Sequence, residues 1–260
     1  MERSTGYIIG FAAAVCLVCS VLVTSSAVSL RERQEENKRL DRQKKILVLA
    51  GLMEKGEGID AAEIDKRFGD NIVAHIVNLT TGEYDTSISV DTFDQREAAK
   101  EVSTSKVAPD NRSGIQRIPN HALIYHVVED GIPVTLIIPI EGKGLWSTLY
   151  GFLALAPDTS TVKGITFYEH GETPGLGGEI ENPSWVAKWP GRQAYDASFT
   201  PVIEVIKGPA GPADTDPHRI DGLAGSTLTS RGVSNLVRFW LGENGFNPYL
   251  EKFRAERSAS

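Results

Sequence analysis

The longest apolar stretch of the chain lies near its N-terminus, where residues 7–30 contain no charged side chain. A helix of about 20 apolar residues spans a bilayer, so this stretch predicts a transmembrane anchor over residues 1–30. A cleaved signal peptide is the alternative, because residues 25–27 are small, as at a cleavage site. The run exceeds the roughly 7–15 residues of a signal core, and Arg31 and Arg33 follow it, which favours a retained anchor.

A charge-rich segment follows the anchor. Residues 31–45 are helix-friendly and predict that the helix continues as a stalk, which we place at residues 31–57. Arg3 is the one basic residue before the span, whereas seven basic residues follow it by position 45. This count, by the positive-inside rule, would place the bulk of the protein in the cytoplasm. The short apolar run at residues 46–52 is expected to pack against the domain that follows.

The remaining residues, 58–260, predict one domain in which strands are mixed with a few helices. A short helical region is expected within residues 53–70, and residues 79–120 predict a polar surface excursion with one helical piece near 94–103. The segments predicted to be strands or buried extended chain are residues 72–78, 122–128, 133–140, 144–155, 164–168 and 201–207. Such a mixture without regular βαβ alternation indicates an α+β fold.

An apolar pattern of helical period lies near the C-terminus and predicts an amphipathic helix that ends at Gly242 and Gly245. Residues 221–230 (DGLAGSTLTS) place glycines and hydroxyls at the start of that helix. Helix N-termini expose unpaired N–H groups and a positive dipole end, which favour a phosphate. The alternative is that Thr229 or Ser230 simply caps the helix. The apolar positions are Val233, Leu236, Val237, Trp240 and Leu241.

A second glycine-rich stretch covers residues 170–179 (HGETPGLGGE). Its glycines allow the backbone to approach a planar or anionic ligand, and Thr173 offers a hydroxyl; an ordinary Gly/Pro turn is the alternative. His170, Glu172 and Glu179 match no standard spacing of metal ligands, so we expect no metal.

Residues 141–147 (EGKGLWS) come near a dinucleotide-binding loop, but Ser147 replaces the third glycine and no clear helix follows. The chain alone is therefore not expected to bind or oxidise NADH. Trp146 is expected in the core or in the wall of a ligand pocket, and Trp185, Trp189 and Trp240 are expected in the core.

Composition narrows the class of partner. The net charge of −7 and the lack of a basic groove argue against nucleic acid as a partner. Both cysteines, Cys16 and Cys19, lie inside the apolar span, so the domain has no disulfide and no thiolate metal site.

Residues 221–229 (DGLAGSTLT) resemble the flavinylation motif of covalent FMN proteins, usually D-x-x-[ST]-G-A-T-x-[ST]. In that family the motif threonine carries FMN through a phosphoester bond, and it aligns with Thr227. Ala224 stands where Ser or Thr is usual, and Ser226 where Ala is usual. Both residues are small, so the loop can still form.

Further motifs are similar to those of one family, the C subunits of the Na+-translocating NADH:quinone reductases. Together with the single N-terminal span, these motifs are spread over nearly the whole chain, which makes the resemblance far more specific than one short motif. They are residues 42–47 (RQKKIL), 144–147 (GLWS), 170–177 (HGETPGLG) and 239–250 (FWLGENGFNPYL).

The resemblance implies an FMN-binding domain with FMN attached to Thr227. It also implies that residues around this threonine and in two loops contact the cofactor, with Lys207 near the phosphate or a ring oxygen; an ordinary surface role is the alternative for Lys207. The expected contact residues besides Thr227 are Trp146, Thr173, Leu176, Gly177, Lys207, Ser226 and Leu228.

The same resemblance implies a role and partners. We expect the flavin to relay electrons in a membrane Na+-pumping NADH:quinone reductase, with the other subunits as partners. A separate flavin transferase, using FAD and Mg2+, would install the FMN. The domain would lie on the periplasmic side of the inner membrane, contrary to the charge count. The G subunit of a ferredoxin:NAD+ reductase complex, or a membrane-anchored, non-catalytic FMN-binding sensor or assembly module, are the alternatives.

Overall fold

The structure is a computed structural model and describes residues 4–259. The chain forms two compact units, Met1–Arg42 and Gln43–Ser260. Helix α1 (Thr5–Leu49) runs through the first unit into the second, which confirms that the charged residues after the apolar span continue the same helix. Among the described residues it is the one helix long and apolar enough to cross a membrane. The exact limits of anchor and stalk stay a prediction.

The second unit is built on a five-stranded antiparallel sheet with the strand order β1-β4-β5-β6-β7. Residues 72–78 form a strand as predicted, and a tight turn at residues 130–131 joins β4 to β5 as a hairpin. A mainly antiparallel sheet with separate helices confirms the α+β class. The strands are β1 (Ile72–Asn78), β4 (His121–Glu129), β5 (Ile132–Lys143), β6 (Thr148–Leu155) and β7 (Val162–Glu169).

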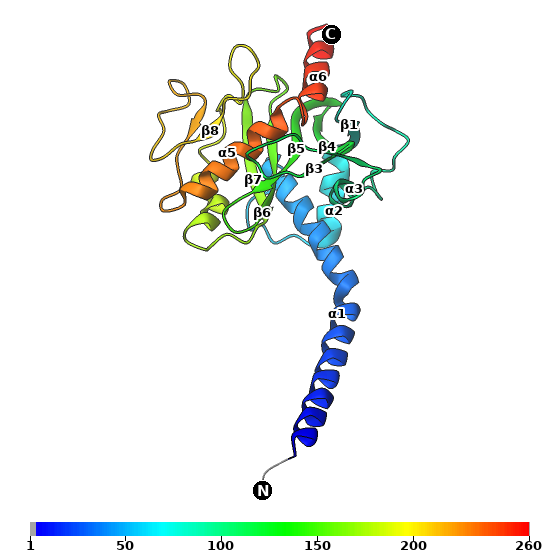
Figure 1. The fold of residues 1–260 in the computed structure, drawn as a ribbon. Helices are drawn as coiled ribbons and strands as arrows, with labels where there is room; N and C mark the ends of the chain where they lie inside the picture. The colour runs from blue at the N-terminus through cyan, green and yellow to red at the C-terminus, as the bar shows by residue number, and fades with distance from the viewer. Residues whose placement is uncertain (1–3, 260) are drawn as a thin grey trace. The chain divides into compact units, whose positions relative to one another are not determined.

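Helix α5 (Thr227–Leu241) lies across one face of this sheet (Figure 1). Its apolar residues, such as Leu236 and Trp240, are fully buried against strand residues such as Ile138. The indole N–H of Trp240 donates a hydrogen bond of 2.8 Å to the carbonyl oxygen of Glu141. The predicted amphipathic helix and the core positions of Trp185, Trp189 and Trp240 are therefore confirmed.

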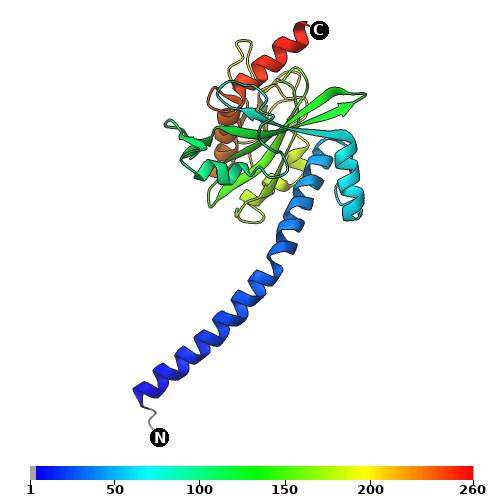
Figure 2. The same ribbon diagram turned by 90° about the vertical axis from the view of Figure 1, so that its right-hand side faces the viewer.

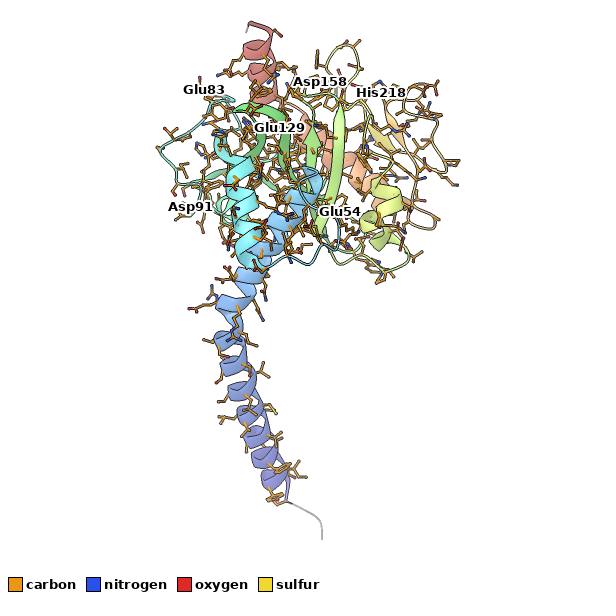
Figure 3. All side chains as sticks on the ribbon, turned by 180° about the vertical axis from the view of Figure 1, so that it is seen from behind. Glu54, Glu83, Asp91, Glu129, Asp158 and His218 are labelled. Atoms are coloured by element: carbon orange, nitrogen blue, oxygen red, sulfur yellow. The ribbon has the colours of Figure 1, made fainter. Side chains whose placement is uncertain are left out.

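The opposite face is covered by the last turns of α1 and by α2 (Ala61–Asn71), as seen from behind in Figure 3. Ile46 and Leu47 are buried there, as expected for the short apolar run. Phe68 of α2 packs edge-on against Tyr125 of β4, with 6.0 Å between the ring centroids. The predicted helical region is shorter than expected, because residues 53–59, ahead of the N-cap Asp60, form a short turn and irregular chain.

Smaller elements complete the domain, and the sequence pattern missed several of them. The polar excursion contains the expected helix, but also a two-stranded sheet, β2–β3, that was not predicted. The last helix, α6, which follows α5 and ends at the C-terminus (Figure 2), was not predicted either. These elements are α3 (Gln95–Lys100), β2 (Ser105–Val107), β3 (Arg117–Pro119), η1 (Gly177–Glu181), α4 (Pro183–Val186), β8 (Glu204–Val205), β9 (Arg219–Ile220) and α6 (Asn247–Ala259).

Candidate functional site

The glycine- and hydroxyl-rich segment lies at the N-terminus of α5, as its pattern predicted. Ser226 is the N-cap residue and makes no capping hydrogen bond with its side chain. Thr229 and Ser230 lie inside the first turn, so the interpretation of either one as a simple N-cap is wrong. Thr227 is the first helical residue, and it is exposed to solvent.

The turn before α5 depends on two residues of the motif. Gly225 has a φ of 72°, in the left-handed region where residues with a Cβ are strained. The carboxylate of Asp221 accepts a hydrogen bond from the N–H of Ala210 at 3.0 Å and forms an ion pair with Lys188. Burial opposes ionisation of Asp221, but Lys188 and the Ala210 N–H outweigh it and lower its pKa. Asp221 thus fixes the start of the turn that presents Thr227.

The second glycine-rich stretch approaches the start of α5 through the carboxylate of Glu172. This side chain is buried, with 5% of its surface exposed. Its Oε2 accepts a hydrogen bond of 2.6 Å from the hydroxyl of Thr229, whose side chain is fully buried. Its Oε1 accepts hydrogen bonds from the backbone N–H groups of Leu145 and Trp146. Three segments that are distant in the sequence therefore meet at one carboxylate.

Two glycines make room for this carboxylate. A Cβ atom on Gly144 would lie 2.6 Å from Glu172 Oε1, and a Cβ on Gly177 would lie 2.6 Å from Oε2. Both distances are too short for a carbon–oxygen contact, so each position excludes any larger residue unless Glu172 moves. Gly177, one of the glycines predicted to allow a ligand to approach the backbone, therefore has a packing role as well.

The predicted contact residues fall into two groups around Thr227. Lys207 and Thr227 line the same open cleft, of about 750 Å³, which residues of α5 and β8 also line. Arg231, one helical turn after Thr227, lines this cleft too and adds a second positive charge. Sequence reasoning missed Arg231, although its spacing of four residues from Thr227 on a predicted helix was a usable signal.

The other group is apolar and exposed. Trp146 has 71% of its surface exposed, so its assignment to the core is wrong, and a place in a ligand-pocket wall stays a prediction. Leu176 is 45% exposed and Leu228 is 52% exposed. Leu176 lies next to the motif, because a Cβ on Gly225 would be 3.0 Å from its Cδ2. Thr173 is exposed in the same loop as Leu176, and its carbonyl accepts the Leu176 N–H at 3.1 Å.

Residues 141–147 carry no dinucleotide fold. They form the end of β5 and its connection to β6, its antiparallel neighbour, whereas a dinucleotide loop joins a strand to a helix in a βαβ unit. The carboxylate of Glu172 accepts hydrogen bonds from N–H and O–H donors. Sequence reasoning considered this side chain only as a metal ligand. Nothing in the local sequence signals these hydrogen bonds, because the donors lie 25 or more residues away.

Comparisons with known proteins place this geometry in a family. Residues 144–242 match the FMN-binding domain family, a span that contains the Trp146 loop, the Glu172 loop and all of α5. The C subunit of the Na+-translocating NADH-quinone reductase of Pseudomonas aeruginosa is 44% identical over 256 residues, which is 97% of each chain. The corresponding protein of Yersinia pestis is 45% identical, over 92% of this chain and 90% of that protein.

Solved structures agree with the sequence comparisons. The crystal structure of NqrC from Shewanella oneidensis superposes with a TM-score of 0.77 at 34% identity and covers 84% of this chain and 99% of that chain. The corresponding protein of Parabacteroides distasonis superposes with a TM-score of 0.65 at 26% identity, covering 85% and 96%. The chain therefore belongs to the family of the C subunits of the Na+-translocating NADH-quinone reductases, and is a subunit of that oxidoreductase with an FMN-binding domain.

Proposed function

We propose that this chain carries FMN covalently on Thr227 and relays electrons within a membrane Na+-translocating NADH:quinone oxidoreductase. The observation that carries the proposal is the position of Thr227: an exposed hydroxyl on the first residue of a helix, inside the segment that matches the FMN-binding domain. The other predicted contact residues stay part of this proposal.

The start of α5 suits a phosphate. Within residues 4–259, the N–H groups of Thr227 and Leu228 have no acceptor, and the N-cap Ser226 supplies none from its side chain. Free N–H groups at a helix N-terminus stabilise a phosphate. Lys207 and Arg231 line the cleft beside Thr227, so their positive charges favour an anion there as well.

The surroundings of Thr227 suit the flavin ring too. Leu176 and Leu228 expose apolar surface at the motif, and the exposed Trp146 belongs to a loop that Glu172 joins to Thr229. Exposed apolar surface of this kind is available for a planar aromatic ligand. Bound FMN supplies the redox chemistry by accepting and donating electrons, and the protein supplies orientation and electrostatics. In this proposal Lys207, which lines the cleft, holds a negative charge on the phosphate or on a ring oxygen.

Attachment requires a donor of the FMN group, and we propose that this is FAD, bound by a flavin transferase with Mg2+. The Thr227 oxygen forms a new bond to the phosphorus of the FMN half, the pyrophosphate P–O bond of FAD breaks, AMP leaves, and the hydroxyl proton is released. The exposure of Thr227 fits this proposal, because an enzyme acting in trans must reach the hydroxyl.

We also propose that α1 holds the domain at the inner membrane and that the domain lies on its periplasmic side. The basic residues after the span would by themselves favour the cytoplasm. The orientation of one helix within a complex of several subunits need not follow its own flanking charges, so the family resemblance outweighs the count. Membership of this family also favours the proposed role over that of the G subunit of a ferredoxin:NAD+ reductase.

One experiment tests attachment. The full chain is expressed with its flavin transferase, denatured, and examined for protein-bound flavin fluorescence and for the mass of one added FMN. We expect both signals in the parent and neither in Thr227→Ala. Covalent flavin that persists in Thr227→Ala would overturn the assignment of the attachment site. Purification without other reductase subunits would favour the sensor or assembly module instead of the electron relay.

A further inference from the structure

Glu172 connects the loops around the proposed flavin to the helix that carries Thr227. It belongs to the loop that carries Thr173 and Leu176, and it bonds the Trp146 loop and the first turn of α5. The acceptor distances are short: 3.0 Å from the Leu145 nitrogen, 2.9 Å from the Trp146 nitrogen and 2.6 Å from the Thr229 hydroxyl. A third nitrogen, that of Ser147, lies at 3.4 Å.

We propose that Glu172 is a positioning residue, which holds the Trp146 loop and the first turn of α5 in the geometry that FMN on Thr227 requires. The inference deepens the proposed function and rests on it. It assigns no chemistry to Glu172, because the carboxylate is buried behind Thr229 and the loop backbone and acts on the flavin through them.

A carboxylate suits this position because it accepts several hydrogen bonds and donates none. The loop 144–147 turns three successive, partly buried N–H groups toward one point, and an N–H shielded from water without an acceptor is unfavourable. Oε2 is then free to accept the hydroxyl of Thr229. One side chain therefore accepts hydrogen bonds both from the backbone of a loop and from a side chain of a helix.

The position of the Thr229 contact separates Glu172 from an ordinary helix cap. A capping carboxylate accepts the backbone N–H groups of the first turn. Glu172 instead accepts the side-chain hydroxyl of Thr229, which leaves the N–H groups of Thr227 and Leu228 available for a phosphate. Glu172 can thus fix the helix without competing for its anion site.

The packing of Gly177 against the start of α5 also supports a positioning role for Glu172. Gly177 lies close to the side chains of Glu172 and Thr229. A Cβ on Gly177 would be 2.6 Å from Glu172 Oε2 and 2.7 Å from the Thr229 hydroxyl oxygen. Gly171 is also tied to the Trp146 loop, since its N–H donates to the Ser147 hydroxyl at 2.6 Å. The two loops and the helix form one connected unit around Glu172.

Amide hydrogen exchange tests the unit without any flavin. The full chain in detergent is compared as the parent, Glu172→Ala, Glu172→Gln, Thr229→Val and, as a control in the same loop, Glu179→Ala. The Glu179 carboxylate bonds the side chain of Asn182, which lies outside the unit. We expect Glu172→Ala to speed exchange in residues 144–147 at least about tenfold, while strands β1 and β4 keep the parent rates.

The other variants decide how Glu172 acts. Glu172→Gln keeps an oxygen for the N–H groups, and its side-chain N–H can donate to the Thr229 hydroxyl oxygen, so we expect its rates to stay within about threefold of the parent. Thr229→Val removes only the helix contact and should speed exchange at the start of α5 while sparing residues 144–147. Unchanged exchange in both Glu172→Ala and Thr229→Val would overturn the proposal.

Flavin loading supplies the second readout. With the transferase present, we expect Glu172→Ala to incorporate FMN at least about tenfold more slowly and to alter the visible circular dichroism of the bound flavin, whereas Glu172→Gln and Glu179→Ala match the parent. Parent-like loading and dichroism in Glu172→Ala would overturn the role toward FMN. Loss of the proposed function would appear differently, as covalent flavin that persists in Thr227→Ala, with the exchange results unaffected.

Discussion

The Nε2 atom of His126 lies 2.6 Å from the hydroxyl oxygen of Tyr249, and this contact joins β4 to the C-terminal helix α6. His126 is 4% exposed, and burial lowers its pKa from 6.5 to about 4, with a smaller contribution from the charge of His75. A second hydroxyl, that of Tyr84, lies 3.2 Å from the Tyr249 hydroxyl. A neutral histidine is therefore part of the attachment of α6.

Acid is expected to destabilise the domain through His126. Between pH 6.5 and about 4 the unfolded chain binds a proton at this histidine and the folded chain does not, so the stability falls as the pH falls through this window. The shift corresponds to a loss of about 2–3 kcal/mol in the free energy of unfolding by pH 4. Denaturant unfolding of the parent and of His126→Gln, measured from pH 7 to 4.5, should give a shallower pH dependence for the variant. An equal pH dependence of the free energy of unfolding in the parent and in His126→Gln would contradict the assignment of this effect to His126.

Because α5 lies close to β5 at Gly232, we expect the stability of the domain to depend on this glycine. A Cβ on Gly232 would lie 2.5 Å from the carbonyl oxygen of Lys143, and neither backbone can give way easily. We expect Gly232→Ala to lower the free energy of unfolding by about 1–3 kcal/mol. Gly69 is the matched control, because it is also helical and has open space around it, so Gly69→Ala should raise stability by about 0.5–1 kcal/mol. Thermal unfolding of both variants checks the contrast.

The two departures from the flavinylation motif are expected to be tolerated. Ala224 is exposed, and the buried Ser226 makes no capping bond with its side chain. Ser226→Ala and Ala224→Ser, which restore the usual residues, should each change stability by no more than about 0.5 kcal/mol. We expect FMN incorporation by the transferase to stay within about threefold of the parent. A tenfold faster rate in either variant would show that the departure impairs attachment.

The ion pair between Asp221 and Lys188 is expected to stabilise the turn before Thr227. Asp221→Asn keeps an oxygen for the Ala210 N–H but loses the charge, so it should cost about 0.5–1 kcal/mol at pH 7. The pKa of Asp221 is lowered in the folded state, so this contribution is present above the ordinary value of 3.8 and is lost as the pH falls below it. Unfolding at pH 7 and pH 3 should show the gap between parent and variant closing. A stability difference between parent and Asp221→Asn that is the same at pH 7 and pH 3 would exclude the charge of Asp221 as its cause.

Local patterns predicted the main elements well where the pattern was strong. The strand at residues 72–78 was predicted because the segment is rich in β-branched residues, and the helix that buries Leu236 and Trp240 because its apolar spacing is regular. The missed strands β2 and β3 have three residues each, too few for a period to appear. Helix α6 was missed because its buried positions, which include Leu250 and Phe253, are few and its remaining residues are mostly polar.

The sequence by itself determined the anchor-like helix, the α+β class, the amphipathic helix α5 and the motif around Thr227, because each depends on residues that are close along the chain. Only the tertiary structure decided that Trp146 is exposed, that Lys207 and Arg231 share a cleft with Thr227, and that Glu172 joins two loops to α5. Glu172 and Thr229 are 57 residues apart, and the antiparallel strands β5, β6 and β7 set where their loops end. Contacts of that kind depend on how the sheet and the helix pack, and no local period encodes them.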